Sequence, residues 1–285
     1  MHRLILLLAF MGCGSTPDGS PEPAPVVPVV TAAVAAVAPV VGEPWARRTV
    51  PEGPEHEQAR RGLALATDTH RLLPDHVGDG LNCTNCHLED AQRPKAAPWV
   101  GVTDRYPRFR KRSGKVDDLQ DRINGCFERS MNGTKLEKDS EPMLAMVAYM
   151  TFLSEGIEDG KALADVGMPR IKPPSDPDPT RGEAIYQAKC VACHQTSGAG
   201  MFAPDDQALF PPLWGERSYN IAAGMARLDT AAAFVKWNMP HGQGGTLTDQ
   251  EAYDVASFFI VQDRPDFAKK HLDWPEGGKP RDARY

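Results

Sequence analysis

Three stretches of the chain are rich in apolar residues, and each predicts a particular element. Residues 143–153 (MLAMVAYMTFL) and 251–261 (EAYDVASFFIV) place apolar side chains on successive helical turns, so each predicts a packed helix. The run from Leu4 to Phe10 is apolar throughout, but it is too short to span a bilayer as a helix. The pattern therefore predicts two helical domains that follow a short apolar leader.

Proline-rich segments separate these regions. Residues 14–45 consist largely of Pro, Ala and Val, and residues 167–180 contain several prolines that prevent a continuous helix. Both segments are typical of connections between structured parts of a chain. The expected organisation is a signal over residues 1–13, a tether over 14–45, a first domain over 46–166, a linker over 167–180, a second domain over 181–270 and a tail over 271–285.

The N-terminus has the layout of an export signal. It reads MHRLILLLAFMGCGS, with a basic start, a short apolar run and a small residue directly before Cys13. Gly12 and Cys13 resemble a bacterial lipoprotein cleavage site, so a lipid anchor at Cys13 is expected, with ordinary cleavage and a soluble protein as the alternative. We therefore expect a periplasmic protein that is anchored to a membrane through Cys13.

The overall charge limits the range of partners. The chain has 285 residues, a net charge of -6 and an isoelectric point near 5.8. A general nucleic-acid binder needs a basic face for the phosphate backbone, so we expect no nucleic-acid partner.

Two copies of one cysteine motif give the strongest chemical signal. NCTNCH and KCVACH each place two thiols three positions apart and a histidine directly after the second thiol. Two thiols at this spacing can bond both vinyl groups of one porphyrin, and the histidine then reaches the iron. A disulfide or a zinc site would leave the repeated histidine unexplained. The predicted haem-binding residues are Cys83, Cys86, His87, Cys190, Cys193 and His194.

The two halves of the chain also repeat each other outside these motifs. PWVG at residues 98–101 follows the first motif, PLWG at residues 212–215 follows the second, and each half then ends in an apolar helical pattern. The sequence therefore predicts an all-α protein with two tandem cytochrome c-like domains, each built around one covalent haem c.

The second haem needs a ligand on its other face, and Met239 is the predicted one. It lies in NMPHG, where the following proline restricts the loop, and a thioether is a common distal ligand that favours reduced iron. Lys236 and His241 are alternatives in the same stretch.

The corresponding ligand of the first haem is predicted from the cysteine count. Of six cysteines, four belong to the haem motifs and Cys13 belongs to the signal, so Cys126 has no partner. Cys126 could be a buried apolar residue, but the duplication places it where Met239 stands in the second half. We therefore expect a thiolate ligand, which lowers the potential of the first haem and favours electrons on the second.

Positive charge is concentrated around Cys126. Arg122, Cys126 and Ser130 are spaced four apart, so a helix would place them on one face, with Arg129 nearby. An anion would bind naturally here, although a solvated basic face or a docking site for an acidic partner would give the same composition. The basic segment before them contains Arg105, Arg108, Arg110, Lys111, Arg112 and Lys115.

Three segments resemble the dihaem thiosulfate dehydrogenase family, whose members form tetrathionate. They are GLNCTNCHLED, AAPWVGVTDRYPRFRKRSGKV and RINGCFERSMNG, and the likeness extends from Glu57 to Pro265. The resemblance implies that two thiosulfates are joined with release of two electrons, that the substrate is a small sulfur oxyanion, and that a cytochrome or similar carrier is the redox partner.

The resemblance also implies roles for individual residues. Cys126 would be the distal ligand of a catalytic first haem, Arg122 and Ser130 would hold the substrate, and Arg112 would assist. Some members of the family use a lysine at the second haem; here that position is Asn238, so a His194 and Met239 pair is expected.

Two other functions are compatible with two haems. A non-catalytic electron-transfer lipoprotein would use the basic segment to dock an acidic partner. A dihaem peroxidase would need an iron accessible to peroxide, which a tight Cys126 ligand opposes. The direction of a thiosulfate reaction is left open, because oxidation of thiosulfate and reduction of tetrathionate would use one site.

Overall fold

The computed structural model describes residues 44–285. The predicted signal, Cys13 and all but the last two residues of the predicted tether lie outside the described residues. None of the helices between residues 44 and 285 is long and apolar enough to cross a membrane.

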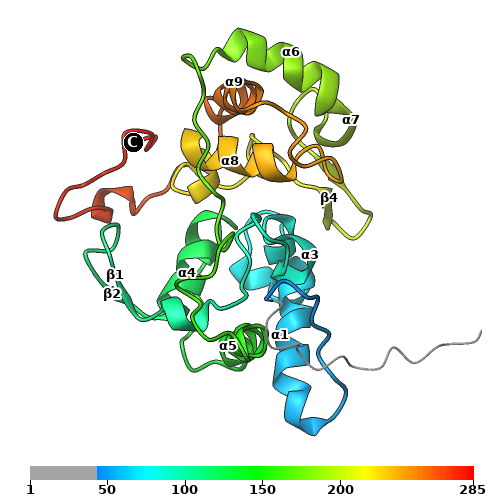
Figure 1. The fold of residues 1–285 in the computed structure, drawn as a ribbon, viewed down its shortest axis with the longest axis vertical. Helices are drawn as coiled ribbons and strands as arrows, with labels where there is room; N and C mark the ends of the chain where they lie inside the picture. The colour runs from blue at the N-terminus through cyan, green and yellow to red at the C-terminus, as the bar shows by residue number, and fades with distance from the viewer. Residues whose placement is uncertain (1–43) are drawn as a thin grey trace, which may run out of the picture. The chain divides into compact units, whose positions relative to one another are not determined.

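The described chain is mainly helical, and its two halves use the same pairing of first and last helices (Figure 1). In the first half α1 (Glu57–Thr67) packs against α5 (Glu141–Ser154). In the second half α6 (Pro179–Lys189) packs against α9 (Asp249–Ile260). The predicted all-α architecture and both predicted apolar helices are thereby confirmed, the second helix ending one residue earlier than expected.

Shorter elements complete each half. Two small antiparallel hairpins are present, one in which Arg108 pairs with Asp117 and one in which Met201 pairs with Phe210. The remaining helices and strands are α2 (Thr69–Leu72), α3 (Leu88–Ala91), β1 (Arg108–Arg110), β2 (Lys115–Asp117), α4 (Leu119–Arg129), α7 (Val191–His194), β3 (Met201–Phe202), β4 (Ala208–Phe210) and α8 (Leu228–Asn238).

A glycine makes the close helix crossing possible in each half. A Cβ added at Gly62 would lie 2.0 Å from the carbonyl oxygen of Ala145, and one added at Gly182 would lie 2.0 Å from that of Asp254. Neither position can hold a side chain without moving a backbone, so glycine allows the two helices to touch. The same contact in both halves agrees with the predicted duplication.

Aromatic residues of the repeated tryptophan motifs pack beside the helix pairs. The Trp99 ring lies 5.2 Å from the His87 ring and 6.1 Å from the Tyr149 ring, while the Trp214 ring lies 5.2 Å from that of Tyr186. Tyr149 and Tyr186 are fully buried. Each tryptophan thus packs against a buried tyrosine of its own half.

Helix α4 carries two of the predicted catalytic residues, Arg122 and Cys126. Leu119, Ile123 and Phe127 are buried at four-residue spacing and attach the helix to the first core. A capping box begins the helix, with Asp118 accepting from the Asp121 backbone N–H at 2.7 Å. Arg122 and Cys126 lie beside this buried face and are themselves partly buried.

Candidate functional site

The first haem motif lies on a 3-10 turn (Cys83–Asn85) that leads into α3. The Asn82 backbone N–H donates to the Asn85 side chain at 2.7 Å, which fixes the turn between the two thiols. His87 donates from Nδ1 to the Ala97 carbonyl oxygen at 2.6 Å. Since a carbonyl can only accept, this bond leaves Nε2 as the nitrogen that is free to bind iron.

The second motif repeats this arrangement at the start of the second half. Cys190 ends α6, and α7 places Cys193 and His194 on the next turn. His194 donates from Nδ1 to the Pro211 carbonyl oxygen at 2.9 Å. Burial lowers the pKa of His194, which favours the neutral imidazole that a metal requires.

Cys126, the predicted distal ligand, lies beside His87 of the first haem motif. Its sulfur accepts a hydrogen bond from Arg122 Nη1 at 2.8 Å and also lies within hydrogen-bonding reach of the His87 ring. Burial opposes ionisation of the thiol, but the Arg122 guanidinium and His87 outweigh it and lower the pKa of Cys126 to about 6. A thiolate is therefore the dominant form at neutral pH.

These four side chains fit a covalent haem. Cys83 and Cys86 lie deep enough for burial to raise their pKa to about 12, yet both keep partial exposure, as side chains that line a hollow do. His87 and Cys126 lie within hydrogen-bonding reach of each other, so both could serve one iron when the haem is bound. The donor set is thus two thiols for thioether bonds, one imidazole and one thiolate.

In the second half the surroundings favour Met239 over its alternatives. Met239 directly follows α8 and packs against the same apolar core as Cys190. Lys236 instead turns to the following loop, where its Nζ contacts the Leu247 carbonyl and lies 3.6 Å from Asp249. His241 is exposed. Met239 thus remains our predicted ligand, and Lys236 is engaged elsewhere.

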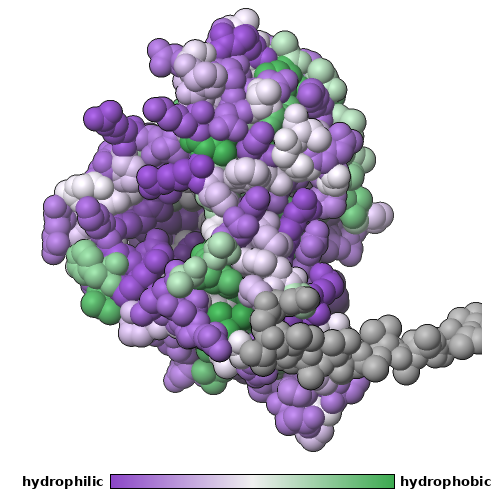
Figure 2. Space-filling view, in the orientation of Figure 1, coloured by the Kyte–Doolittle hydropathy of each residue, from purple (hydrophilic) through white to green (hydrophobic). Residues whose placement is uncertain are grey.

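A pocket of about 140 Å³ opens on the outer face of α4, beside the β1–β2 hairpin. Six cationic side chains line it against three acidic ones, so it favours an anion. Figure 2 shows a recess with hydrophilic walls on this face of the molecule. The lining residues are Arg110, Arg112, Ser113, Lys115, Asp117, Asp121, Arg122, Gly125, Glu128, Arg129 and Lys135.

The structure brings some of the predicted substrate residues together and leaves others apart. Arg122 and Arg112 both line the pocket, and Arg122 donates to Cys126, which is itself outside the lining. Ser130 follows the last residue of α4 and lies outside the lining, so its contact with substrate stays a prediction. Arg105 donates to the carbonyls of Val166 and Pro98, which makes it a structural residue.

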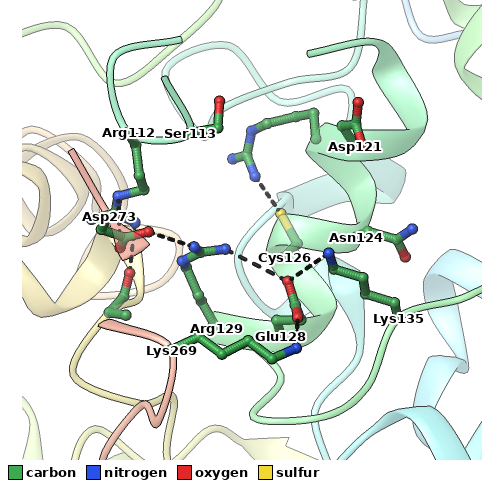
Figure 3. A network of polar contacts seen from close by, with 12 residues as sticks. Arg112, Ser113, Asp121, Asn124, Cys126, Glu128, Arg129, Lys135, Lys269 and Asp273 are labelled. Carbon is green, nitrogen blue, oxygen red and sulfur yellow. Dashed lines mark hydrogen bonds and ion pairs between the residues drawn. The ribbon is translucent and has the colours of Figure 1, made fainter. Parts of the chain in front are cut away.

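The sequence analysis did not identify the acidic residues that pair with cations in and around this pocket. Glu128 lies 2.8 Å from Lys269 and 3.6 Å from Lys135, and Asp273 accepts from Arg129 at 2.8 Å. Figure 3 shows these contacts as one network. Lys269 and Asp273 come from the end of the chain, and nothing in their local sequence marks them as neighbours of α4.

The second half also completes the last turn of α4. The Asn220 side chain donates to the Glu128 carbonyl at 2.9 Å, and its backbone N–H donates to the Arg129 carbonyl at 3.1 Å. Both are carbonyls at a helix C-terminus, which the helix itself leaves without partners. Asn220 is 1% exposed, so these bonds form away from water.

Known families match both halves. Residues 76–158 match the family described as SoxA/TsdA, cytochrome c domain, and residues 177–259 match the family of cytochrome c oxidase, cbb3-type, subunit III. With one haem motif in each domain, the chain holds two covalent haem c groups, as the sequence predicted.

Curated relatives and a solved structure agree with these matches. The chain is 42% identical to a thiosulfate dehydrogenase of Psychrobacter arcticus over 83% of its own length and 72% of the relative. It is 45% identical to a thiosulfate dehydrogenase of Allochromatium vinosum over 76% of its own length and 82% of the relative.

The structure of the thiosulfate dehydrogenase TsdBA from Marichromatium purpuratum aligns with a TM-score of 0.73 and 39% identity. The alignment covers 77% of this chain and 49% of that one. From these likenesses we conclude that the chain belongs to the thiosulfate dehydrogenase family.

Proposed function

We propose that this protein oxidises thiosulfate and joins two thiosulfate ions into one tetrathionate ion, with release of two electrons. One observation carries the proposal: Arg122, which lines a pocket of mainly cationic side chains, donates to the sulfur of Cys126 at 2.8 Å. Family membership supports thiosulfate as the substrate, since relatives at 42% and 45% identity bear that name. We also propose that the reverse reaction, reduction of tetrathionate, uses the same site.

The cationic pocket has a clear task in this reaction. Thiosulfate is a dianion, so two copies repel each other when they approach. Arg112, Arg122 and Arg129 can offset this repulsion and hold both ions in a fixed orientation. Because these groups are already held in place, they can stabilise the charge without a large rearrangement.

Cys126 supplies the nucleophile. In the first step its sulfur bonds the terminal sulfur of one thiosulfate, giving Cys–S–S–SO₃⁻ and releasing two electrons. In the second step another thiosulfate uses its terminal sulfur to attack the sulfur that came from the first thiosulfate. Tetrathionate forms, and the Cys126 thiolate leaves. When bound, the two haem groups supply the electron acceptors, one electron each. No proton is required in either step, so the site needs no general base.

Arg122 assists both steps through Cys126. Its guanidinium stabilises the thiolate before attack and again when the thiolate leaves. The remaining N–H groups of the same side chain can bind a sulfonate oxygen, which would place the terminal sulfur of the substrate against Cys126. Ser130 is proposed as a further hydrogen-bond donor at the end of α4, and Met239 as the distal ligand of the second haem.

We further propose a partner and a location. Electrons leave through the second domain to a cytochrome or similar carrier, because methionine ligation favours reduced iron there. The N-terminal sequence supports an exported protein that is anchored through Cys13.

The test compares the purified holoprotein with its Cys126→Gly variant. Thiosulfate is supplied with an artificial electron acceptor, and tetrathionate is supplied separately with a reduced donor, while product and haem absorbance are followed. Turnover that vanishes in the variant supports the proposal, and the spectrum of the second haem serves as the internal control for folding. Inertness of the wild type in both directions would favour the electron-transfer protein, and normal turnover in the variant would overturn the role of Cys126.

A further inference from the structure

The last twenty residues of the chain pack against the anion pocket. We call residues 266–285 the C-terminal segment. Its Trp274 backbone N–H donates to the Arg112 carbonyl at 2.8 Å, and the Arg112 guanidinium lies 4.6 Å from the centre of the Trp274 ring. Pro275 sits so close to Gly114 in the turn of the β1–β2 hairpin that an added Cβ there would lie 2.5 Å from its ring. Figure 1 shows this segment, in red, beside the hairpin.

The charges of the C-terminal segment complement those of α4. Adjacent residues Glu128 and Arg129 at the end of α4 face Lys269 and Asp273, which are four positions apart. Lys269 contacts Glu128 at 2.8 Å, and Asp273 contacts Arg129 at 2.8 Å. Each acidic group thus meets a basic group from the other element, which fixes the register of the contact.

Asp273 is the centre of this arrangement. Its side chain is 3% exposed and lies 3.5 Å from Arg112 Nε as well as 2.8 Å from Arg129 Nη2. The Tyr285 hydroxyl donates to Oδ2, the oxygen that faces Arg112, whereas Arg129 contacts Oδ1, so Tyr285 also holds Asp273 in place. Arg112 also donates to the Ala222 carbonyl at 2.7 Å. The two guanidiniums that Asp273 joins both line the pocket.

A buried carboxylate in this position limits where the two arginines can point. Burial lowers the pKa of Arg112 to about 10, while Tyr285 and Asp273 act in the opposite direction. A desolvated guanidinium without a counter-ion would turn toward water or toward another acceptor. Asp273 contacts one nitrogen of each guanidinium, Nε of Arg112 and Nη2 of Arg129, and so limits the direction of both side chains beside the pocket.

We propose that the C-terminal segment supports the lining of the anion pocket from outside and that Asp273 is a positioning residue that aims Arg112 and Arg129 at the bound sulfur anions. This inference rests on the proposed function, because it assigns the pocket to that substrate. It adds to that function a residue that acts through the arginines and does not touch the substrate.

The direction in which dianion affinity changes in an Asp273 variant distinguishes a positioning role from a purely electrostatic one. Replacing Asp273 by Asn removes a negative charge near the pocket, and by Coulomb attraction alone this would tighten the binding of a dianion. If Asp273 acts by positioning, the arginines lose their orientation and binding weakens instead. A merely structural role would lower thermal stability and leave both KM and anion affinity unchanged.

The experiment uses the holoprotein and its Asp273→Asn variant. Calorimetric titration with sulfate, an unreactive dianion, reports binding, and steady-state kinetics with thiosulfate report KM and kcat. We expect the sulfate Kd and the thiosulfate KM to rise by roughly tenfold, the usual scale for loss of a supporting hydrogen-bond partner. Asp273→Glu, which keeps the charge, should recover part of the loss.

The matched control is Asp282→Asn, in the same segment. The Asp282 carboxylate accepts from the Asp229 backbone N–H at 3.1 Å and lies outside the pocket lining, so both constants should stay at wild-type values. If Asp273→Asn fails to fold, Tyr285→Phe removes one hydrogen bond to Asp273 and should raise both constants by a smaller factor in the same direction.

The outcomes distinguish this inference from the proposed function. A fall or no change in both constants in Asp273→Asn and Tyr285→Phe overturns the positioning role, even with a fully active wild type. If sulfate binding depends on Asp273 but the wild type does not turn over thiosulfate, the proposed function is overturned and the positioning role of Asp273 is supported. A wild type that neither binds sulfate nor turns over thiosulfate overturns both.

Discussion

The two halves of this protein share a scaffold and differ at the residues predicted to be the distal haem ligands. In each, a glycine allows the first and last helices to touch, and the proximal histidine donates Nδ1 to a backbone carbonyl, of Ala97 in one half and Pro211 in the other. The first half then places Cys126 on a helix beside a cationic pocket, whereas the second places Met239 just after α8.

This difference shows where new chemistry can arise in a duplicated domain. The helix crossing and the proximal side are constrained by packing, because a side chain at either glycine would collide with a backbone. No such collision restricts the surroundings of Cys126 and Met239. The first half has a pocket that favours an anion beside α4, while Met239 of the second half packs against an apolar core.

The largest expected effect comes from giving the first half the ligand of the second. Cys126→Met should retain both haems but lower thiosulfate turnover by at least about 10³-fold, because the nucleophile is lost. Turnover is measured with an artificial acceptor, and haem content from the absorption spectrum. The reciprocal variant Met239→Cys should lower the potential of the second haem without creating a second catalytic site. Near-normal turnover of Cys126→Met would show that Cys126 is not what makes the first half catalytic.

The next largest effect concerns the cationic side chain four positions before Cys126, Arg122, and the one three positions before Met239, Lys236. Arg122→Ala should lower kcat/KM by roughly 10²-fold, since it removes a charged donor to the Cys126 sulfur and the substrate. Lys236→Ala is the matched change in the second half, and it should leave kcat/KM near the wild-type value because Lys236 contacts a loop and Asp249. Equal losses in the two variants would contradict a catalytic difference between the halves.

The shared scaffold predicts equal costs at the two helix crossings. Gly62→Ala and Gly182→Ala should each lower the free energy of unfolding by about 1–3 kcal/mol, because the added methyl overpacks the contact. Scanning calorimetry of the holoprotein measures the loss. Gly167→Ala is the control, since an added Cβ there meets nothing within 4 Å. A cost in only one half would show that the two crossings are not equivalent.

The smallest effect is expected at Gly125, which lines the pocket within α4. An added Cβ would meet only Arg129 Nη1, at 3.6 Å, so packing does not require glycine there. Gly125→Ala should therefore stabilise the helix by about 0.5–1 kcal/mol. It should also raise the thiosulfate KM a few-fold, because the methyl group enters the pocket. Unchanged KM with higher stability would mean that the substrate does not use this part of the lining.

Features that depend on local sequence could be predicted. Three such features each span only a few helical turns, and the structure contains all of them. They are the spacing of each haem motif, the helical period of residues 143–153 and the four-residue step from Arg122 to Cys126. Ser130 shows the limit of this reasoning. The four-residue step continues to it, but α4 ends at Arg129, so the rule for a helix face no longer fixes its direction.

Features that depend on distant segments could not be predicted. Lys269 and Glu128 are 141 residues apart, and Asp273 and Arg129 are 144 residues apart. Each pair joins ordinary surface-type residues, and no periodicity or motif relates one partner to the other. The basic segment before Cys126 was visible in the sequence, but which of its cations line a pocket is decided by the hairpin and by the C-terminal segment.

The bonds from Asn220 to the end of α4 have a consequence for how such proteins can be recombined. The helix that bears Cys126 is finished by a residue of the other domain, so a first domain joined to a foreign second domain would inherit its nucleophile on an uncapped helix. Only a donor that supplies an equivalent amide at that place would restore the cap. Exchange of whole two-domain chains is therefore expected to preserve this cap, whereas exchange of single domains is not.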